Sequence, residues 1–551
     1  MTTPDEAPAF DIVIVGAGFG GLCALHKCRQ LGKRAAVFEA APDVGGTWYW
    51  NSYPGARCDV ESLGYNFSFD ADLKREYQSK WPERFSAQPV ILEYARHVAD
   101  RYALRTDIRF KTRVTRAIWA EDRRFWIVET DRGDQITARF LVSAVGCLSS
   151  AQVPSLEGID TFEGSWHHTG NWPKDGVNFE AKHVVLIGTG STGVQAAPII
   201  AESAARLTVL QRTPHYAAPA RNYALTRENL EREIQRVANF YAARYPADGD
   251  PPISWHGMNT VMTFDDPPES RQRRFEQLWE RGGAGFFLAY KDTMTDLKAN
   301  NEVSEFVRTM IRFAVKDPAT AAKLLPTYPI GTKRMIAETN YYEMYNRPNV
   351  YLEDIRSDPI ERVTAHGIRL KSGHEIEADI LVFATGYDAL TGSILRLNIE
   401  GVGGLPLMSA WEAGPRTLLG LAVHGFPNFF MITGPQSPSV LSNVIYSIEQ
   451  HVDWLGELFQ FLDARGFDRV EASLSAQDHW VSYCASLANQ TLYQHTDSWY
   501  MGANIPGKPR TFLPFVGGNV LYKRRLDEVR DENYTRFALS SSTVDSSARA
   551  S

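Results

Sequence analysis

The stretch IVIVGAGFGG, residues 12–21, decides the fold of this chain. Four apolar residues run into the spacing Gly16-x-Gly18-x-x-Gly21, and a helical pattern follows. Glycine is needed there because a tight turn, a close backbone approach to a pyrophosphate and tight helix packing each exclude a Cβ. The carboxylate of Glu39, 23 positions after Gly16, suits a ribose 2'-hydroxyl. This segment therefore predicts a strand, a helix and a second strand that bind a flavin with an ADP moiety, FAD.

The same pattern returns in VVLIGTGSTG, residues 184–193, with the same glycine spacing. At the matching offset the acid is missing, and Gln211 is followed by Arg212. Exchanging an acid for a cation is what the 2'-phosphate of NADPH requires. One glycine-rich turn can simply connect two elements, whereas two such turns, each between an apolar strand and a helical pattern, indicate two nucleotide sites.

We predict an α/β fold with two Rossmann-like dinucleotide-binding domains, one for FAD and one for NADP, and a mainly helical insertion. Apolar runs at 140–146 and 380–384 predict further buried strands, whereas residues 225–325 carry charge at helical spacing. The expected order is a first FAD part at 1–150, a first NADP part at 151–222, the helical insertion at 223–330, a second NADP part at 331–380, a second FAD part at 381–538 and a disordered tail at 539–551.

Composition excludes several classes of function. The chain has 551 residues, 44% hydrophobic content and a net charge of -7, so it offers no basic field for nucleic acid or for an anionic membrane. Its five cysteines form no C-x-x-C pair and no metal-ligand spacing, so we expect reduced thiols and no metal. The acidic start lacks a secretory leader, and no apolar run approaches the length of a membrane span. We therefore expect a cytoplasmic monomer or weak homo-oligomer with a small-molecule partner.

Two further strings carry a resemblance to a known family. Residues 45–59, GGTWYWNSYPGARCD, and residues 162–173, FEGSWHHTGNWP, fill every fixed position of the two signatures of the type I Baeyer–Villiger monooxygenases. The resemblance continues through QRTP at 211–214, GTKR at 331–334, ATGYD at 384–388 and SWYMGANIPGK at 498–508. It spans residues 10–535, which is essentially the whole chain.

The resemblance implies an enzyme that converts ketones to esters or lactones with FAD, NADPH and O2, with oxidation of sulfides as a side activity. In that family NADPH reduces the flavin, which then captures oxygen as a C4a-peroxyflavin. Such an anion needs a fixed cation and a dry site. Arg334 matches the family's catalytic arginine, and Asp59 matches the acid that orients it. Judged without the resemblance, Arg334 would be a surface arginine and Asp59 a helix N-cap.

The remaining site residues follow from the fingerprints and the resemblance. Arg212 and Lys333 are predicted to bind the 2'-phosphate of NADPH. Trp499 matches the tryptophan that closes over nicotinamide ribose and substrate, although a core position stays open. His168 resembles a residue that couples the domains, so we do not count it as catalytic. The predicted cofactor-binding residues are Gly16, Gly18, Gly21, Glu39, Gly46, Thr47, Trp48, Asp59, Gly188, Gly190, Ser191, Thr192, Gly193, Arg212, Thr213, Lys333, Arg334 and Trp499. The predicted substrate-pocket residues are Ser439, Val440, Leu441 and Trp499.

Loop 434–443 is more similar to the phenylacetone and steroid monooxygenase branch than to the cyclohexanone branch, but it does not identify the ketone.

Other classes of protein share parts of this sequence pattern. Flavin-containing monooxygenases and N-hydroxylases share the double fingerprint but lack the signatures at 45–59 and 162–173. A flavoprotein without substrate turnover, or an NADPH oxidase that releases hydrogen peroxide, would bind the same cofactors. The oxygenated product distinguishes these classes.

Overall fold

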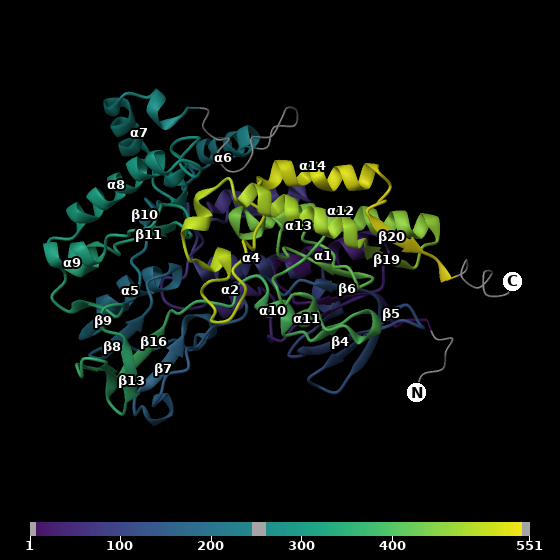
Figure 1. Ribbon diagram of the computed structural model, residues 1–551, viewed down its shortest axis with the longest axis horizontal. Helices are drawn as coiled ribbons and strands as arrows, with labels where there is room; N and C mark the ends of the chain where they lie inside the picture. Colours follow the sequence, from purple (N-terminus) through teal and green to yellow (C-terminus); the bar gives the residue numbers. More distant parts are fainter. Residues whose placement is uncertain (1–6, 245–260, 543–551) are drawn as a thin grey trace.

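The computed structural model describes residues 7–244 and 261–542. Figure 1 shows two sheets side by side, with helices stacked above them and both described ends of the chain on the same side of the molecule. The predicted α/β class with two nucleotide-binding units is confirmed. Within the described ranges, no helix combines the length and the apolar character that crossing a membrane requires.

The first sheet forms around the first glycine fingerprint. Its strands, in spatial order, are β17 (Ile399–Glu400), β4 (Val114–Ala120), β5 (Phe125–Thr130), β6 (Gln135–Ser143), β1 (Phe10–Val15), β2 (Ala35–Phe38) and β3 (Ile108–Arg109), with β18 (Phe429–Met431) beside β6. β1 runs parallel to both of its neighbours, β2 and β6. Its Val13 pairs with Ala36 of β2 and with Leu141 of β6. Val13 is fully buried, which explains why this strand is apolar throughout its centre.

The second sheet forms around the second fingerprint and is parallel throughout. Its strands, in spatial order, are β12 (Val350–Asp354), β9 (Arg206–Gln211), β8 (His183–Ile187), β16 (Ile380–Phe383) and β7 (Ser165–His168). The expected return to the FAD part at residue 381 therefore falls inside β16, which pairs with β8 and β7. An apolar run predicts a buried strand but does not say which of two sheets it joins.

The segment between the two NADP parts is helical, with α6 (Leu230–Arg244), α7 (Pro268–Arg281), α8 (Leu297–Ala314) and α9 (Pro318–Lys323). These helices lie at the end of the molecule that holds the second sheet (Figure 1). Phe275 and Trp279 of α7 and Phe306 of α8 belong to the same buried cluster as Leu186 of β8. α7 and α8 therefore share one core with the second nucleotide-binding unit, whereas Val237 of α6 belongs to the main cluster of the first sheet.

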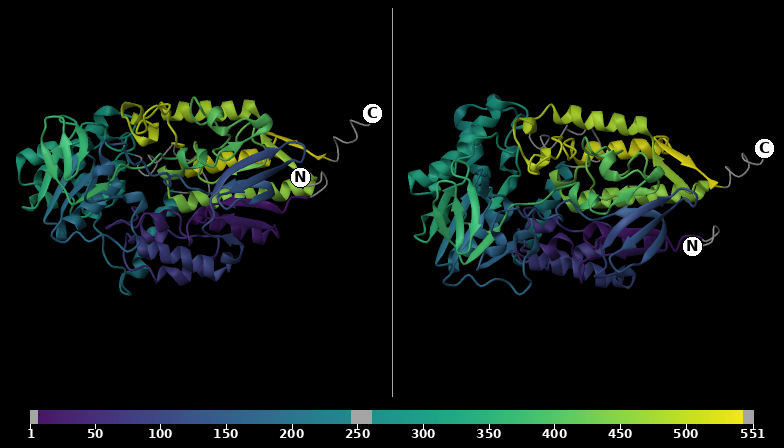
Figure 2. Two further views of the ribbon diagram at one scale, coloured as in Figure 1. Left: turned by 90° about the horizontal axis from the view of Figure 1, so that it is seen from below. Right: turned by 60° about the horizontal axis from the view of Figure 1, so that its bottom comes forward.

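Helices from both ends of the chain cover the first sheet. α1 (Phe19–Gln30), α12 (Val444–Arg465), α13 (Leu474–Ala488) and α14 (Gly518–Asp531) contribute to its main buried cluster. Figure 2 shows α12 to α14 as a yellow-green layer along the first sheet. The antiparallel pair β19 (Arg469–Ala472) and β20 (Phe537–Ser540) closes this layer. The expected disordered tail is therefore wrong at its start, because Leu539 pairs with Val470, while residues 543–551 lie outside the described chain.

The remaining elements connect these layers. The helices are α2 (Thr47–Trp50), α3 (Ala71–Gln78), α4 (Gln88–Arg101), α5 (Ser191–Ser203), α10 (Gly392–Leu395) and α11 (Leu407–Ala410). The strands are β10 (Ala217–Pro219), β11 (Ile336–Glu338), β13 (Ile360–Thr364), β14 (Gly367–Leu370) and β15 (Glu375–Glu377).

Candidate active site

Each glycine fingerprint forms the turn between a strand and a helix. Gly16 and Gly188 adopt φ values of 103° and 109°, which a residue with a Cβ rarely adopts. A Cβ added at Gly21 would lie 1.8 Å from the carbonyl oxygen of Gly16, and one added at Gly193 would lie 2.2 Å from that of Gly188. The two turns therefore have the same geometry, and the third glycine lets each helix pack directly on its turn.

A cavity of ≈ 2060 Å³ runs past both turns. Ligand pockets usually measure about 300–1,000 Å³, so this one has room for two dinucleotides. The predicted cofactor residues in its lining are Gly16, Gly18, Glu39, Gly46, Thr47, Trp48, Asp59, Gly188, Gly190, Ser191, Thr192, Arg212, Thr213, Lys333, Arg334 and Trp499. Gly21 and Gly193 stand behind this lining, where they pack against the turns.

The side of the cavity at the first sheet fits an FAD nucleotide. Glu39 is buried, and its carboxylate accepts hydrogen bonds from the N–H of Ala17 at 2.6 Å and of Ala41 at 2.7 Å. Burial raises the pKa of Glu39, although these N–H groups partly oppose that shift. Gly46 has φ 53°, and a Cβ there would lie 2.8 Å from the Cα of Gly18. The close approach of these two glycines leaves open the space that a pyrophosphate requires.

The side of the cavity at the second sheet carries two cations. Lys333 donates a hydrogen bond to the carbonyl oxygen of Asp497, while Arg212 is exposed and has no ion-pair partner among the described residues. Burial and the charge of Arg212 lower the pKa of Lys333. The neighbouring His215 stays neutral, because burial and Lys333 lower its pKa to about 3. Two adjacent cations that repel each other fit a doubly charged phosphate.

Arg334 and Asp59 form a two-point ion pair. Nε of Arg334 donates to Oδ2 of Asp59 at 2.9 Å, and Nη2 donates to Oδ1 at 2.8 Å. Nη1 donates to the carbonyl oxygen of Val440 at 2.9 Å. Burial opposes the charged guanidinium, but Asp59 and Tyr500 outweigh it and raise the pKa of Arg334. The cation is therefore fixed in place and keeps N–H groups for a further acceptor.

A second cavity, of ≈ 530 Å³, lies against this ion pair. Asp59, Arg334 and Val440 line both this cavity and the larger one. Leu441 lines the smaller cavity and Trp499 the larger one, whereas Ser439 lines neither. Ser439 is fully buried, because the short helical turn that begins at this residue directs successive side chains to different sides. The placement of Ser439 in a substrate pocket stays a prediction.

Comparisons with known proteins agree with this geometry. The family model for pyridine nucleotide-disulphide oxidoreductases matches residues 10–236. A Baeyer–Villiger monooxygenase of Pseudooceanicola batsensis is 41% identical over 96% of this chain and 95% of its own. The chain belongs to the Baeyer–Villiger monooxygenases. The family predicted from the resemblance is confirmed, and the protein is a monooxygenase that uses FAD, NADPH and O2.

Two further relatives bear on the chemistry of this monooxygenase. A solved structure of oxidized steroid monooxygenase bound to NADP shares 44% sequence identity with a TM-score of 0.89, and the match covers 96% of this chain and 99% of that one. A phenazine N-monooxygenase of Lysobacter antibioticus is 38% identical over 97% of both chains. Full-length similarity therefore extends to a protein named for oxidation at nitrogen.

The structure explains why the monooxygenase needs the signature at 45–59. The hydroxyl of Tyr53 donates to Oε1 of Gln195 in α5 at 2.7 Å, and Nε2 of Gln195 donates to the carbonyl oxygen of Arg57 at 3.1 Å. A Cβ added at Gly55 would lie 2.3 Å from the carbonyl oxygen of Gln195. The signature therefore holds the helix of the second fingerprint against the first nucleotide-binding unit.

His168 lines neither cavity of the monooxygenase. Its Nδ1 accepts a hydrogen bond from the N–H of Gly170 at 2.9 Å, and its ring meets Tyr387 edge-on. Burial lowers the pKa of His168 to about 4. These contacts fit a structural role for His168, which the sequence analysis did not count among the catalytic residues.

Sequence reasoning missed several residues around Arg334. Tyr500 and Tyr493 line the smaller cavity, and burial raises the pKa of Tyr500 to about 12. Gln195 was also missed, although its place after the second fingerprint gave a signal for contact with the other unit. Among the residues that the structure describes, no group of His, Cys, Asp and Glu side chains is arranged to hold a metal ion.

Proposed function

We propose that this monooxygenase oxidises small-molecule ketones to esters or lactones, and sulfides to sulfoxides as a side reaction. The observation that carries the proposal is the Arg334–Asp59 pair, which stands at the boundary between a cavity that fits two dinucleotides and a smaller cavity of substrate size. When bound, NADPH supplies a hydride, and FAD accepts it and activates O2. The substrate then enters the smaller cavity, beside Arg334.

The chain's own residues supply position and charge. Arg334 offers its remaining N–H groups to negative charge that develops on the reacting oxygen atoms and on the ketone oxygen. Asp59 acts as a positioning residue, because its two hydrogen bonds hold the guanidinium plane. Arg212 and Lys333, which both line the larger cavity, hold the 2'-phosphate of NADPH. A cytoplasmic location, a monomeric or weakly oligomeric state and the domain limits at 1–150, 151–222 and 223–330 stay predictions.

A second candidate is oxidation at nitrogen. It is favoured by the similarity to the phenazine N-monooxygenase. The two activities share cofactors and overall architecture, so only the product separates them.

The purified yellow protein is tested with NADPH in air, with phenylacetone, with cyclohexanone and with a phenazine, and the products are identified by chromatography. Ester or lactone formed in proportion to NADPH consumed supports the proposal. An N-oxide without any ester or lactone supports the second candidate. Hydrogen peroxide as the only product in the presence of each of the three substrates contradicts both candidate functions.

A further inference from the structure

The wall of the smaller cavity carries charge that the oxygen-transfer step does not use. Besides Asp59 and Arg334, its charged residues are Glu61, Arg84, Arg274 and Arg281. Four arginines thus face two acids across one cavity of ≈ 530 Å³. The ion pairs that each charged side chain makes show whether this excess of positive charge is neutralised within the protein.

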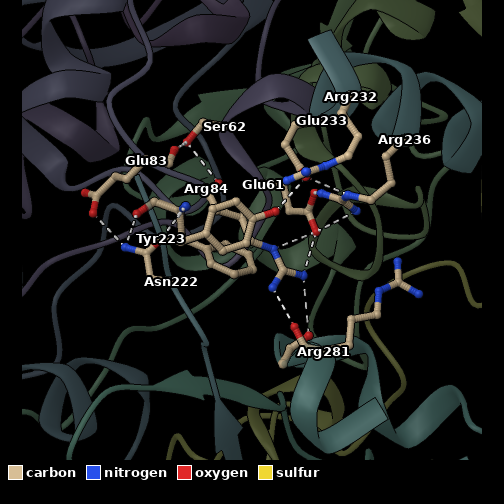
Figure 3. A network of polar contacts seen from close by, with 12 residues as sticks. Glu61, Ser62, Glu83, Arg84, Asn222, Tyr223, Arg232, Glu233, Arg236 and Arg281 are labelled. Atoms are coloured by element: carbon tan, nitrogen blue, oxygen red, sulfur yellow. Dashed lines mark hydrogen bonds and ion pairs between the residues drawn. The ribbon is translucent and has the colours of Figure 1, made fainter. Parts of the chain in front are cut away.

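Asp59 is paired with Arg334, and Glu61 of the wall and Glu233 behind it are paired with other arginines. Nε and Nη2 of Arg84, which is only 5% exposed, donate to Oε1 of Glu61 at 3.0 and 2.7 Å. Arg236 donates from Nη2 to Oε2 of the same carboxylate, and from Nε to Oε2 of Glu233 at 2.7 Å. Figure 3 shows Glu61 between the guanidinium groups of Arg84 and Arg236. These carboxylates therefore have no free oxygen for a further cation of the wall.

Within residues 7–244 and 261–542, Arg281 is the cation of this wall for which the structure shows no partner. Arg274 pairs with Asp266 at 3.1 Å, and Arg84 donates to the backbone carbonyl of Arg281 at 2.6 Å, but the guanidinium of Arg281 makes no hydrogen bond or ion pair with any described residue. In Figure 3 the side chain of Arg281 extends away from the network, and no contact is drawn to its guanidinium. Arg281 is an exposed residue that also lines the cavity, and the partial burial of its guanidinium, with Arg236 and Arg84 adding to it and Glu61 opposing it, lowers its pKa.

The position of Arg281 at the end of α7 explains part of this arrangement. A cation in the last turn of a helix interacts favourably with the helix dipole. That interaction does not require the side chain to line a cavity beside two other arginines, where an arginine stays charged at neutral pH. Because Arg281 is an exposed residue, water solvates its charge, and a carboxylate of a molecule in the cavity can replace that water through charge-assisted hydrogen bonds.

We propose that Arg281 binds a carboxylate of the substrate, so that the preferred ketones are oxo acids. The inference rests on the proposed function, because the ketone carbonyl is placed at Arg334. A sphere of the cavity's volume is roughly 10 Å across, so one small molecule reaches both arginines. The rest of the wall is largely apolar and suits the carbon chain between carbonyl and carboxylate. Its apolar members include Val237, Leu278, Phe286, Phe287, Met335 and Leu441.

The test compares three methyl ketones that differ only at the end remote from the carbonyl: 7-oxooctanoate, its methyl ester and 2-octanone. For the enzyme loaded with FAD, with NADPH supplied, we expect kcat/KM for the acid to exceed that for the ester by about tenfold, which is about 1.4 kcal/mol. Arg281→Ala is expected to abolish this preference and Arg281→Glu to invert it. Arg273→Ala is the matched control, because Arg273 is an exposed arginine of α7 outside the cavity.

The outcomes separate the two proposals. Equal rates for acid and ester in the native protein, or a preference that Arg281→Ala leaves intact, would overturn the carboxylate site while leaving ketone oxidation standing. If no ketone is oxidised, the proposed function fails, and calorimetric binding of 7-oxooctanoate to the protein loaded with FAD and NADP+ decides the carboxylate site alone. Binding that weakens tenfold in Arg281→Ala but not in Arg273→Ala supports the site, and equal binding by both variants refutes it.

Discussion

Replacing Asp59 by alanine tests the central pair of the site. The change removes two charge-assisted hydrogen bonds, at 2.9 and 2.8 Å, from the guanidinium of Arg334. Each such bond contributes about 1.5–3 kcal/mol when buried. The two side chains are 30% and 19% exposed, which places the sum near the lower end, at about 3 kcal/mol. If the guanidinium loses this orientation, the rate of oxygen transfer falls by about 100-fold.

The assay separates hydride transfer from oxygen transfer. We expect the rate of flavin reduction by NADPH without oxygen to stay within about threefold of the native rate, because the oriented cation is needed only after oxygen arrives. In air, NADPH consumption then yields hydrogen peroxide in place of ester. Asp72→Ala is the matched control, since Asp72 is 72% exposed and pairs at the surface with Arg75. An Asp59→Ala protein that forms ester at more than a tenth of the native rate would refute this reasoning.

Three other substitutions probe separate parts of the molecule. Arg334→Ala is expected to reduce its flavin with NADPH but to form no ester from a ketone; ester at the native rate would show that this arginine does not stabilise the reacting oxygen. Arg212→Ala is expected to lower the ratio of kcat/KM for NADPH over NADH by about tenfold, with FAD still bound, and an unchanged ratio would assign the phosphate to Lys333 alone. His451 is fully buried, and burial lowers its pKa from 6.5 to about 3. The unfolded ring therefore takes up a proton that the folded ring refuses, and the chain loses about 2 kcal/mol of stability between pH 7 and pH 5 from this residue. Urea unfolding at both pH values should show a smaller loss for His451→Asn, and an equal loss in both proteins would contradict the assignment.

The sequence predicted the two nucleotide turns well because their geometry depends on residues close together in the chain. Gly16 and Gly21 must meet across one turn, so their spacing carries the structural information by itself. Asp59 and Arg334 are separated by 275 residues, and no local pattern shows that they touch. The family resemblance identified both residues, and the structure shows the hydrogen bonds between them.

Other features depend on packing that no local pattern encodes. The strand at 380–383 is apolar, which either sheet would require. Only its pairing with β8 shows that it belongs to the second sheet. Ser439 belongs to a predicted pocket loop, but one turn of helix directs it into the protein. That Arg281 has no ion-pair partner in the described part of the chain emerges only when the partners of Glu61 and Arg274 are known.

The hydrogen bond from Tyr53 to Gln195 limits how this protein can be recombined with its relatives. An engineer who wishes to change coenzyme preference by grafting a foreign NADP unit would cut near residue 151 and after β16, which ends at Phe383. That graft brings a new helix to the old signature loop, whose Gly55 lies directly against the backbone of Gln195. Residues 45–59 therefore have to travel with the grafted unit, although the chain order places them in the other one.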